Sequence, residues 1–89
     1  MTAKTFEFEP HGVCPRKIRL ELEQGRIHRV EFLGGCDGNL QGICRLVQGM
    51  GAQEVISRLM GVKCGQKPTS CPDQLAQALA IALREHEQD

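Results

Sequence analysis

The 89-residue chain contains no tryptophan or tyrosine, and its three aromatic residues are all phenylalanines. So few aromatic side chains argue against a base-stacking surface for single-stranded nucleic acid. Basic and acidic residues number 11 each, so no net charge draws the chain to nucleic acid or to an anionic membrane. No stretch approaches a membrane span, and the amino terminus lacks the apolar segment of a secretory signal. We therefore expect a cytoplasmic protein without a nucleic-acid or membrane partner.

The common motifs of catalysis are absent as well. The sequence contains no Ser-His-Asp order, phosphate-binding loop, pair of catalytic carboxylates or dinucleotide fingerprint. Its length predicts a single domain over residues 1–89, with few residues to spare for a substrate pocket. Whether the chain is an enzyme stays open here, with the balance against an enzyme that acts alone.

The apolar periodicity predicts three strands followed by three helices. Alternation indicates strands over residues 4–9, 16–23 and 26–33, the last two joined by a hairpin loop at Gln24 and Gly25. Helical spacing follows over residues 38–49 and 52–60, and a last helix opens at Pro72. Strands first and helices after predict an α+β fold, a three-stranded antiparallel sheet with helices packed on one face.

Cysteine is the residue type with the most informative placement. Four of the five cysteines occur beside turn-forming residues, where the chain changes direction: Cys14, Cys36, Cys64 and Cys71. The fifth, Cys44, falls on the apolar stripe of a predicted helix, which indicates core packing. In a cytoplasmic protein, clustered cysteines indicate metal or redox chemistry more often than a disulfide framework.

The hairpin register brings two of these thiols together. With a two-residue loop, Arg16 is predicted to face Leu33, and Cys14 to face Gly35, which is next to Cys36. Facing Cα atoms in an antiparallel pair are roughly 4.5 to 5.5 Å apart. The open end of the hairpin is therefore predicted to hold Cys14 beside Cys36.

The other two thiols are predicted to join them. Cys71 comes at the start of the last helix, where amide donors and the helix dipole favour a thiolate. The loop from Cys64 to Cys71 is rich in glycine, proline and polar residues and can fold back on itself. Five neighbouring residues are candidates to support the site through positive charge, helix capping or close backbone approach: Arg16, Asp37, Gly38, Lys63 and Lys67.

Spacing alone leaves three interpretations of these cysteines: shared metal coordination, a redox pair, or packing. The zinc fingers and ribbons with a Cys-x-x-Cys knuckle are excluded, because the chain has no such knuckle.

The residues around Cys71 resemble a known family. The run Pro68-Thr69-Ser70-Cys71-Pro72-Asp73 is similar to the signature of TSCPD-domain proteins, and the surroundings of the other three cysteines resemble its small, four-cysteine members. The domain also occurs as an extension of adenosylcobalamin-dependent ribonucleotide reductases. The resemblance therefore implies a role accessory to ribonucleotide reductase, and through it to DNA replication.

A more distant resemblance is to the iron–sulfur cluster scaffolds of the IscU/NifU type, which have a similar fold. Their three cysteines correspond to Cys14, Cys36 and Cys71, but Arg16 stands where they have an aspartate and Ser70 where some have a histidine. Cys64 offers a fourth thiolate, and four thiolates suit a closed, structural type of site.

We therefore expect a small metal-binding module with a protein partner, either a reductase or a cluster-handling protein. Zinc is the favoured ion and an iron–sulfur cluster is second. The alternatives are a thiol–disulfide module that supplies electrons to a ribonucleotide reductase, and an iron–sulfur cluster scaffold.

Overall fold

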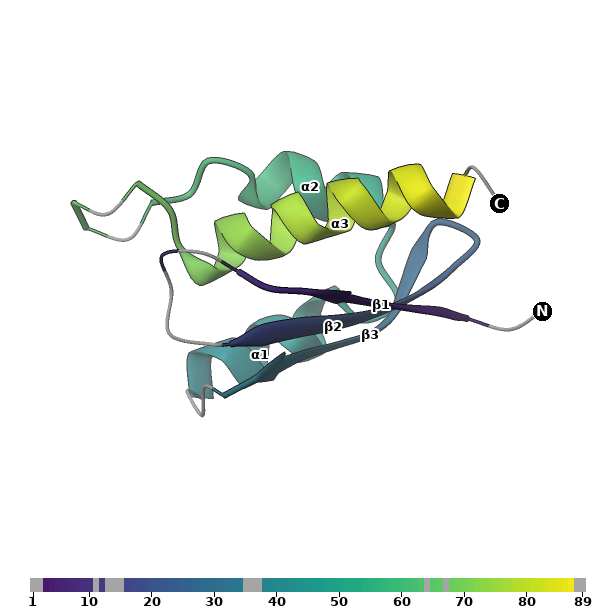
Figure 1. Cartoon of the computed structure of the whole chain (residues 1–89), viewed down its shortest axis with the longest axis horizontal. Coiled ribbons are helices and arrows are strands. Elements are labelled where there is room, and N and C mark those ends of the chain that lie inside the picture. The colour runs from purple at the N-terminus through teal and green to yellow at the C-terminus, as the bar shows by residue number, and fades with distance from the viewer. Residues whose placement is uncertain are drawn as a thin grey trace.

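A computed structural model describes residues 3–10, 12, 16–34, 38–63, 65, 66 and 68–87. Of these, residues 86 and 87 are described by their backbone only. It contains three strands and then three helices: β1 (Lys4–Phe8), β2 (Lys17–Glu23), β3 (Arg26–Leu33), α1 (Gly38–Val47), α2 (Ala52–Leu59) and α3 (Cys71–Glu87). The strands form one antiparallel sheet in the order β1-β2-β3 (Figure 1). The predicted α+β fold is confirmed, and the predicted element ends differ from the observed ones by at most two residues.

The hairpin between β2 and β3 has the predicted two-residue loop. Gln24 and Gly25 adopt positive φ angles of 53° and 78°, as a tight turn that matches the twist of its strands requires. Glu23 faces Arg26, which is the predicted register at this end of the hairpin.

A β-bulge then shifts the register by one residue. Glu21 pairs with Arg29 and Leu22 with Ile27, so His28 has no partner in β2. Lys17 therefore faces Leu33, and the prediction that Arg16 faces Leu33 is wrong. A constant register allows for no extra residue, whereas a bulge inserts one into a single strand.

The core lies between one face of the sheet and the helices. Ile18, Leu20 and Leu22 of the central strand are fully buried, and they alternate with charged residues as the sequence predicts. Helix α3 covers this face with Leu75, Ala78, Leu79 and Ala82, and α2 packs beside α3 (Figure 1). The other face of the sheet carries charged side chains, among them Glu7, which pairs with Lys17 at 3.3 Å and with Arg19 at 3.1 Å.

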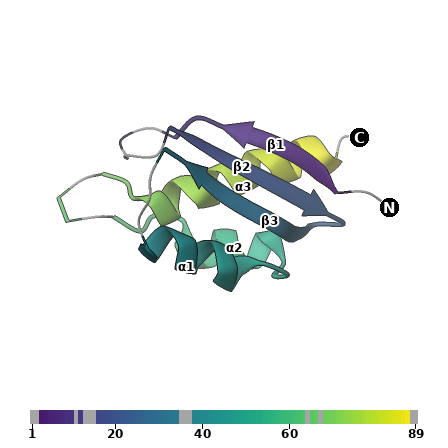
Figure 2. The same cartoon turned by 90° about the horizontal axis from the view of Figure 1, so that it is seen from below.

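Helix α1 lies along the outer edge of β3 (Figure 2). Its carboxyl end is fastened to the hairpin, because Gly49 donates to the Ile27 carbonyl at 2.7 Å and Ile27 donates to the Met50 carbonyl at 2.8 Å. Ala52, at the start of α2, donates to the Gly25 carbonyl at 2.9 Å. These bonds direct the amino end of α1 toward the opposite end of the sheet, where α3 also begins (Figure 1).

Among the described residues, no helix is both long and apolar enough to cross a membrane.

Candidate functional site

The predicted site residues divide into two groups. Cys71, Arg16, Gly38 and Lys63 belong to the described part of the chain. Five others lie outside the described residues: Cys14, Cys36, Cys64, Asp37 and Lys67. Of the predicted ligands only Cys71, half-buried at the start of α3, is therefore placed, and the meeting of the four thiols stays a prediction.

The described residues that flank Cys14 and Cys36 are in contact. The backbone amide of Arg16 donates to the Leu33 carbonyl at 2.8 Å, which extends the pairing of β2 and β3 by one bond. A Cβ atom built on Gly34 would lie 3.2 Å from the Arg16 backbone nitrogen and 3.2 Å from its Cγ. Gly34 also has a φ of 88°, so its lack of a side chain permits both the conformation and the close approach.

A second contact joins the segment before Cys14 to the segment before Cys71. A Cβ atom built on Gly12 would lie 3.1 Å from Cγ2 of Thr69. This distance is shorter than ordinary van der Waals contact, so Gly12 and Thr69 are direct neighbours. Together with the Arg16–Gly34 contact, it places described neighbours of Cys14, Cys36 and Cys71 at one end of the fold.

A buried polar cluster surrounds the start of α3. The Thr69 hydroxyl donates to Oδ2 of Asp73 at 2.5 Å and accepts from Nε2 of Gln74 at 2.9 Å. All three side chains are buried. Buried polar groups are costly unless they are hydrogen-bonded, and these satisfy one another.

Asp73 is the centre of this cluster. Its Oδ1 accepts from the Gly61 backbone amide at 2.7 Å, and its Oδ2 accepts also from Nε2 of Gln77 at 3.0 Å. The Thr69 hydroxyl first, and then the Gly61 amide, lower the pKa of Asp73 below its ordinary value, against the opposing effect of burial. A carboxylate in this position ties the chain after α2 to the first turn of α3.

Ser70 makes a second tie between the same two segments. Its Oγ accepts from the Asp73 amide at 3.2 Å, which caps α3, and donates to the Val62 carbonyl at 2.6 Å. Val62 stands two positions before Cys64 in the sequence. The residues on either side of Cys71 therefore also hold the chain that leads to Cys64.

The sequence prediction did not assign these roles to Thr69, Ser70, Asp73 and Gln74. A readable signal existed, because Ser70 and Asp73 have the spacing of a helix-capping motif. Their further partners are backbone groups of Gly61 and Val62, which no side-chain pattern reveals.

The three described residues that were predicted to support the site make few contacts there. Arg16, Gly38 and Lys63 are solvent-exposed, and a Cβ atom on Gly38 would meet no described atom within 4 Å. Within the described part of the chain, no three His, Cys, Asp or Glu side chains gather closely enough to hold a metal ion. Three of the four predicted ligands fall outside that part.

The family of this chain follows from comparison with known protein families. The family model for the TSCPD domain matches residues 2–83, nearly the whole length. The chain belongs to the TSCPD-domain family. No curated protein and no solved structure matches it. In this TSCPD domain, the threonine, serine and aspartate of the signature are the residues that form the buried cluster around Cys71.

Cys44 of the TSCPD domain is a packing residue, as predicted. It lies on α1, half-buried, and contacts the core cluster. Burial raises the pKa of its thiol, and the charge of Glu31 acts in the same direction, whereas a hydrogen bond from the backbone of Phe32 partly opposes them.

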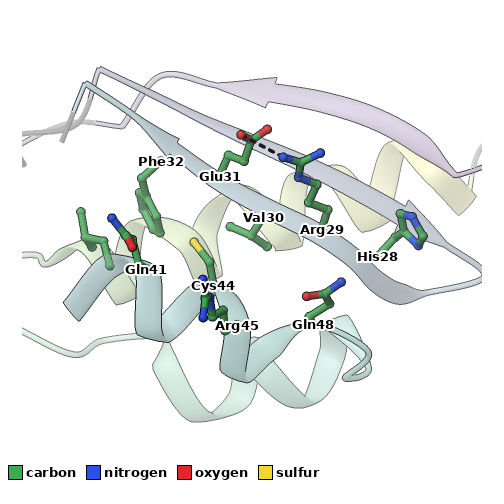
Figure 3. Close-up of a pocket in the computed structure, with 10 residues that line it drawn as sticks. His28, Arg29, Val30, Glu31, Phe32, Gln41, Cys44, Arg45 and Gln48 are labelled. Carbon is green, nitrogen blue, oxygen red and sulfur yellow. Dashed lines mark ion pairs between the residues drawn. The ribbon is translucent and has the colours of Figure 1, made fainter. Parts of the chain in front are cut away.

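Next to Cys44 the TSCPD domain has an open groove of about 610 Å³ between β3 and α1 (Figure 3). The sulfur of Cys44 points from α1 toward β3 (Figure 3). The groove is lined by His28, Arg29, Val30, Glu31, Phe32, Leu40, Gln41, Cys44, Arg45 and Gln48. No pattern in the sequence indicates this groove, because the strand and the helix that form its walls meet only in the fold.

Proposed function

We propose that this TSCPD domain is a small metal-binding module in which the thiolates of Cys14, Cys36, Cys64 and Cys71 hold one metal ion, with zinc favoured. The observation that carries the proposal is the convergence of described residues near each of these cysteines. The Arg16–Leu33 bond, the Gly12–Thr69 contact and the Ser70–Val62 bond all occur at one end of the fold.

The observed register supports the pairing of two ligands. Ile18 faces Phe32 and Lys17 faces Leu33, so one step back along β2 corresponds to one step forward along β3. Three further steps from Lys17 and from Leu33 lead to Cys14 and Cys36. The ladder itself ends at Lys17 and Leu33, and Gly34 has a φ of 88°, so the register supports the proposal only in that Cys14 and Cys36 follow the same open end of the hairpin.

The chemistry of the donors favours zinc. Four thiolates suit tetrahedral zinc in a closed, structural type of site, and an iron–sulfur cluster is the second candidate for the same donors. Binding to such a site contributes on the order of 10 kcal/mol to folding, as much as the whole stability of a small domain.

We infer a supporting biological role from this. A stable module of this size serves best by docking to a larger protein, and the family relationship suggests ribonucleotide reductase as that partner. In this role the metal stabilises the module, and the partner carries out the reaction.

The test is the metal content of protein purified anaerobically under reducing conditions. We expect about one zinc ion per chain, and its loss on Cys→Ser substitution at each of positions 14, 36, 64 and 71. Cys44→Ser is the matched control and should keep the metal, because Cys44 packs against the core cluster between α1 and β3. Protein without stoichiometric metal would refute the proposal.

Two further readouts separate the alternatives. Iron and acid-labile sulfide in the protein, together with a coloured absorbance spectrum, would indicate that the site holds an iron–sulfur cluster and not zinc. Alkylation with and without a chelator separates metal from redox chemistry: protection that the chelator removes supports a metal, whereas a reactive pair that ignores the chelator supports a thiol–disulfide module.

A further inference from the structure

We propose that the groove between α1 and β3 binds an extended acidic segment of a partner protein. This goes beyond the proposed metal site, because none of the groove residues is a candidate ligand. It therefore stands whichever metal the site holds.

The shape of the groove fits a chain rather than a compact molecule. One wall is made by five consecutive residues, His28 to Phe32, and the other by one side of α1 from Leu40 to Arg45 together with Gln48, just after the helix. Successive residues of a strand point to opposite faces, so a wall made of all five is the edge of the strand. The groove is open to solvent along this edge, whereas small-molecule sites enclose most of their ligand.

The edge of β3 offers backbone groups to such a segment. The Leu33 carbonyl points to β2, where it accepts from Arg16. In an antiparallel sheet, the backbone groups of Val30 then point the other way, toward α1. The outward groups of Ile27 are occupied by Gly49 and Met50, and the Phe32 amide by the Cys44 sulfur, whereas within the described part of the chain Val30 between them has no such backbone partner. Unpaired edge groups are a known means of binding extended peptides.

The charge of the groove favours an acidic segment. Its one acid, Glu31, is already paired with Arg29 at 3.3 Å (Figure 3). Glu31 also lies 3.9 Å from Arg19 of β2. Arg45 forms no ion pair with another described residue. His28 lies 3.9 Å from Glu21 of β2, so the unpaired positive charge of the groove is that of Arg45. An approaching carboxylate would therefore meet a net excess of positive charge.

Apolar and amide side chains complete the lining. Val30, Phe32, Leu40 and Cys44 supply apolar surface, which suits an apolar side chain between acidic ones. Gln41 on α1 and Gln48 just after it are exposed and can bond to a peptide backbone. The occupant we infer thus alternates acidic and apolar residues in an extended conformation.

The test is a titration of the isotope-labelled full chain with a short synthetic peptide of alternating glutamate and leucine, followed by amide chemical shifts. The matched peptide has lysine in place of glutamate. We expect saturable shifts confined to β3 and α1 with the glutamate peptide, weakened by salt, and much weaker binding of the lysine peptide.

Two charge reversals provide the matched variants. Arg45→Glu should weaken the binding about tenfold, which corresponds to about 1.4 kcal/mol. Arg84→Glu makes the same change of net charge at an exposed position of α3 outside the groove, and should leave the affinity unchanged. Gln48→Glu is a second groove variant with the same expected direction.

Equal binding of the two peptides, equal effects of Arg45→Glu and Arg84→Glu, or shifts outside the groove would each overturn the proposal. Metal content is measured on the same samples. Absence of peptide binding in protein that holds its metal would overturn the groove proposal alone. Absence of metal in protein that binds the peptide would overturn the proposed metal site alone.

Discussion

The hydroxyl of Ser70 donates to the carbonyl of Val62 at 2.6 Å, across eight positions of the sequence. This bond fastens the chain that leads to Cys64 to the first turn of α3, where Cys71 lies. We therefore expect Ser70→Ala to lower the free energy of unfolding by about 1–2 kcal/mol, because it removes this tie together with the helix cap. Denaturant unfolding of the metal-loaded protein measures the change.

Ser57→Ala is the control for that substitution. The Ser57 hydroxyl also donates to a carbonyl, that of Glu54, but it is exposed on α2. Its loss should change the stability by less than about 0.5 kcal/mol. Equal effects of the two substitutions would show that the Ser70 bonds contribute nothing special.

Asp73→Asn should be more damaging than its small change in shape suggests. Both oxygens of Asp73 accept hydrogen bonds, from Gly61 on one side and from Thr69 and Gln77 on the other. Whichever way the new amide is placed, its NH₂ group faces a donor in a buried position. We expect a loss of about 2–3 kcal/mol in unfolding experiments. Glu85→Gln, at an exposed position of α3, should have almost no effect.

Gly34→Ala should test the close approach at the open end of the hairpin. Gly34 and Gly49 share a φ of 88°, so alanine is strained equally at both. Only at Gly34 would the new Cβ meet a neighbour, the Arg16 backbone at 3.2 Å; at Gly49 nothing lies within 4 Å. The cost at Gly34 should therefore exceed that at Gly49 by about 1 kcal/mol or more, by thermal or denaturant unfolding. Similar losses of stability for Gly34→Ala and Gly49→Ala would mean that Arg16 can move away from the new Cβ atom without strain.

Gly42→Ala should instead stabilise the protein. Gly42 lies inside α1, is exposed, and has open space where a Cβ atom would be added. Alanine in a helix is favoured over glycine by about 0.5–1 kcal/mol. An unchanged or lower melting temperature would contradict this expectation.

Cys44 should be alkylated slowly in the native protein. Burial raises the pKa of its thiol, so the reactive thiolate is scarce at neutral pH. The rate of Cys44 alkylation should therefore rise at a higher pH than the rate for an ordinary thiol. Because the folded-state pKa is the higher one, this group contributes stability below its ordinary pKa, and the contribution is lost as the pH rises through the folded value. Mass spectrometry of the Cys44 peptide, after labelling in native and in denaturing buffer, gives both rates. Equal rates at neutral pH would contradict the prediction.

The fold was largely predictable because its signals are local. Alternation in β2 places Ile18, Leu20 and Leu22 on one face, and a two-residue loop closes the hairpin. The bulge at His28 was not predicted, although the three-residue step between the buried Ile27 and Val30 departs from strict alternation. This interval alone is a weak signal for a bulge, since a single irregular interval also occurs at strand ends.

The candidate site was predictable only in part. The placement of cysteines beside turns indicated a shared end of the molecule, and the described flanking residues do meet there. The ties that Asp73 makes to Gly61 and Ser70 makes to Val62 were not predictable, because they join a side chain to backbone groups of a separate loop. Such bonds depend on three-dimensional proximity rather than on residue pattern.

The anchoring of α1 has a consequence for how the two proposed sites communicate. The helix is fixed at its carboxyl end through Gly49 and Met50, so any adjustment to an occupant pivots there and is largest at Gly38, two positions after Cys36. If the four thiolates hold a metal as proposed, a strand pressed against Phe32 and Leu40 would act on the helix that follows one of its ligands, Cys36. Thermodynamic linkage then requires reciprocity: the factor by which loading with metal changes the affinity for a partner equals the factor by which the partner changes the affinity for metal.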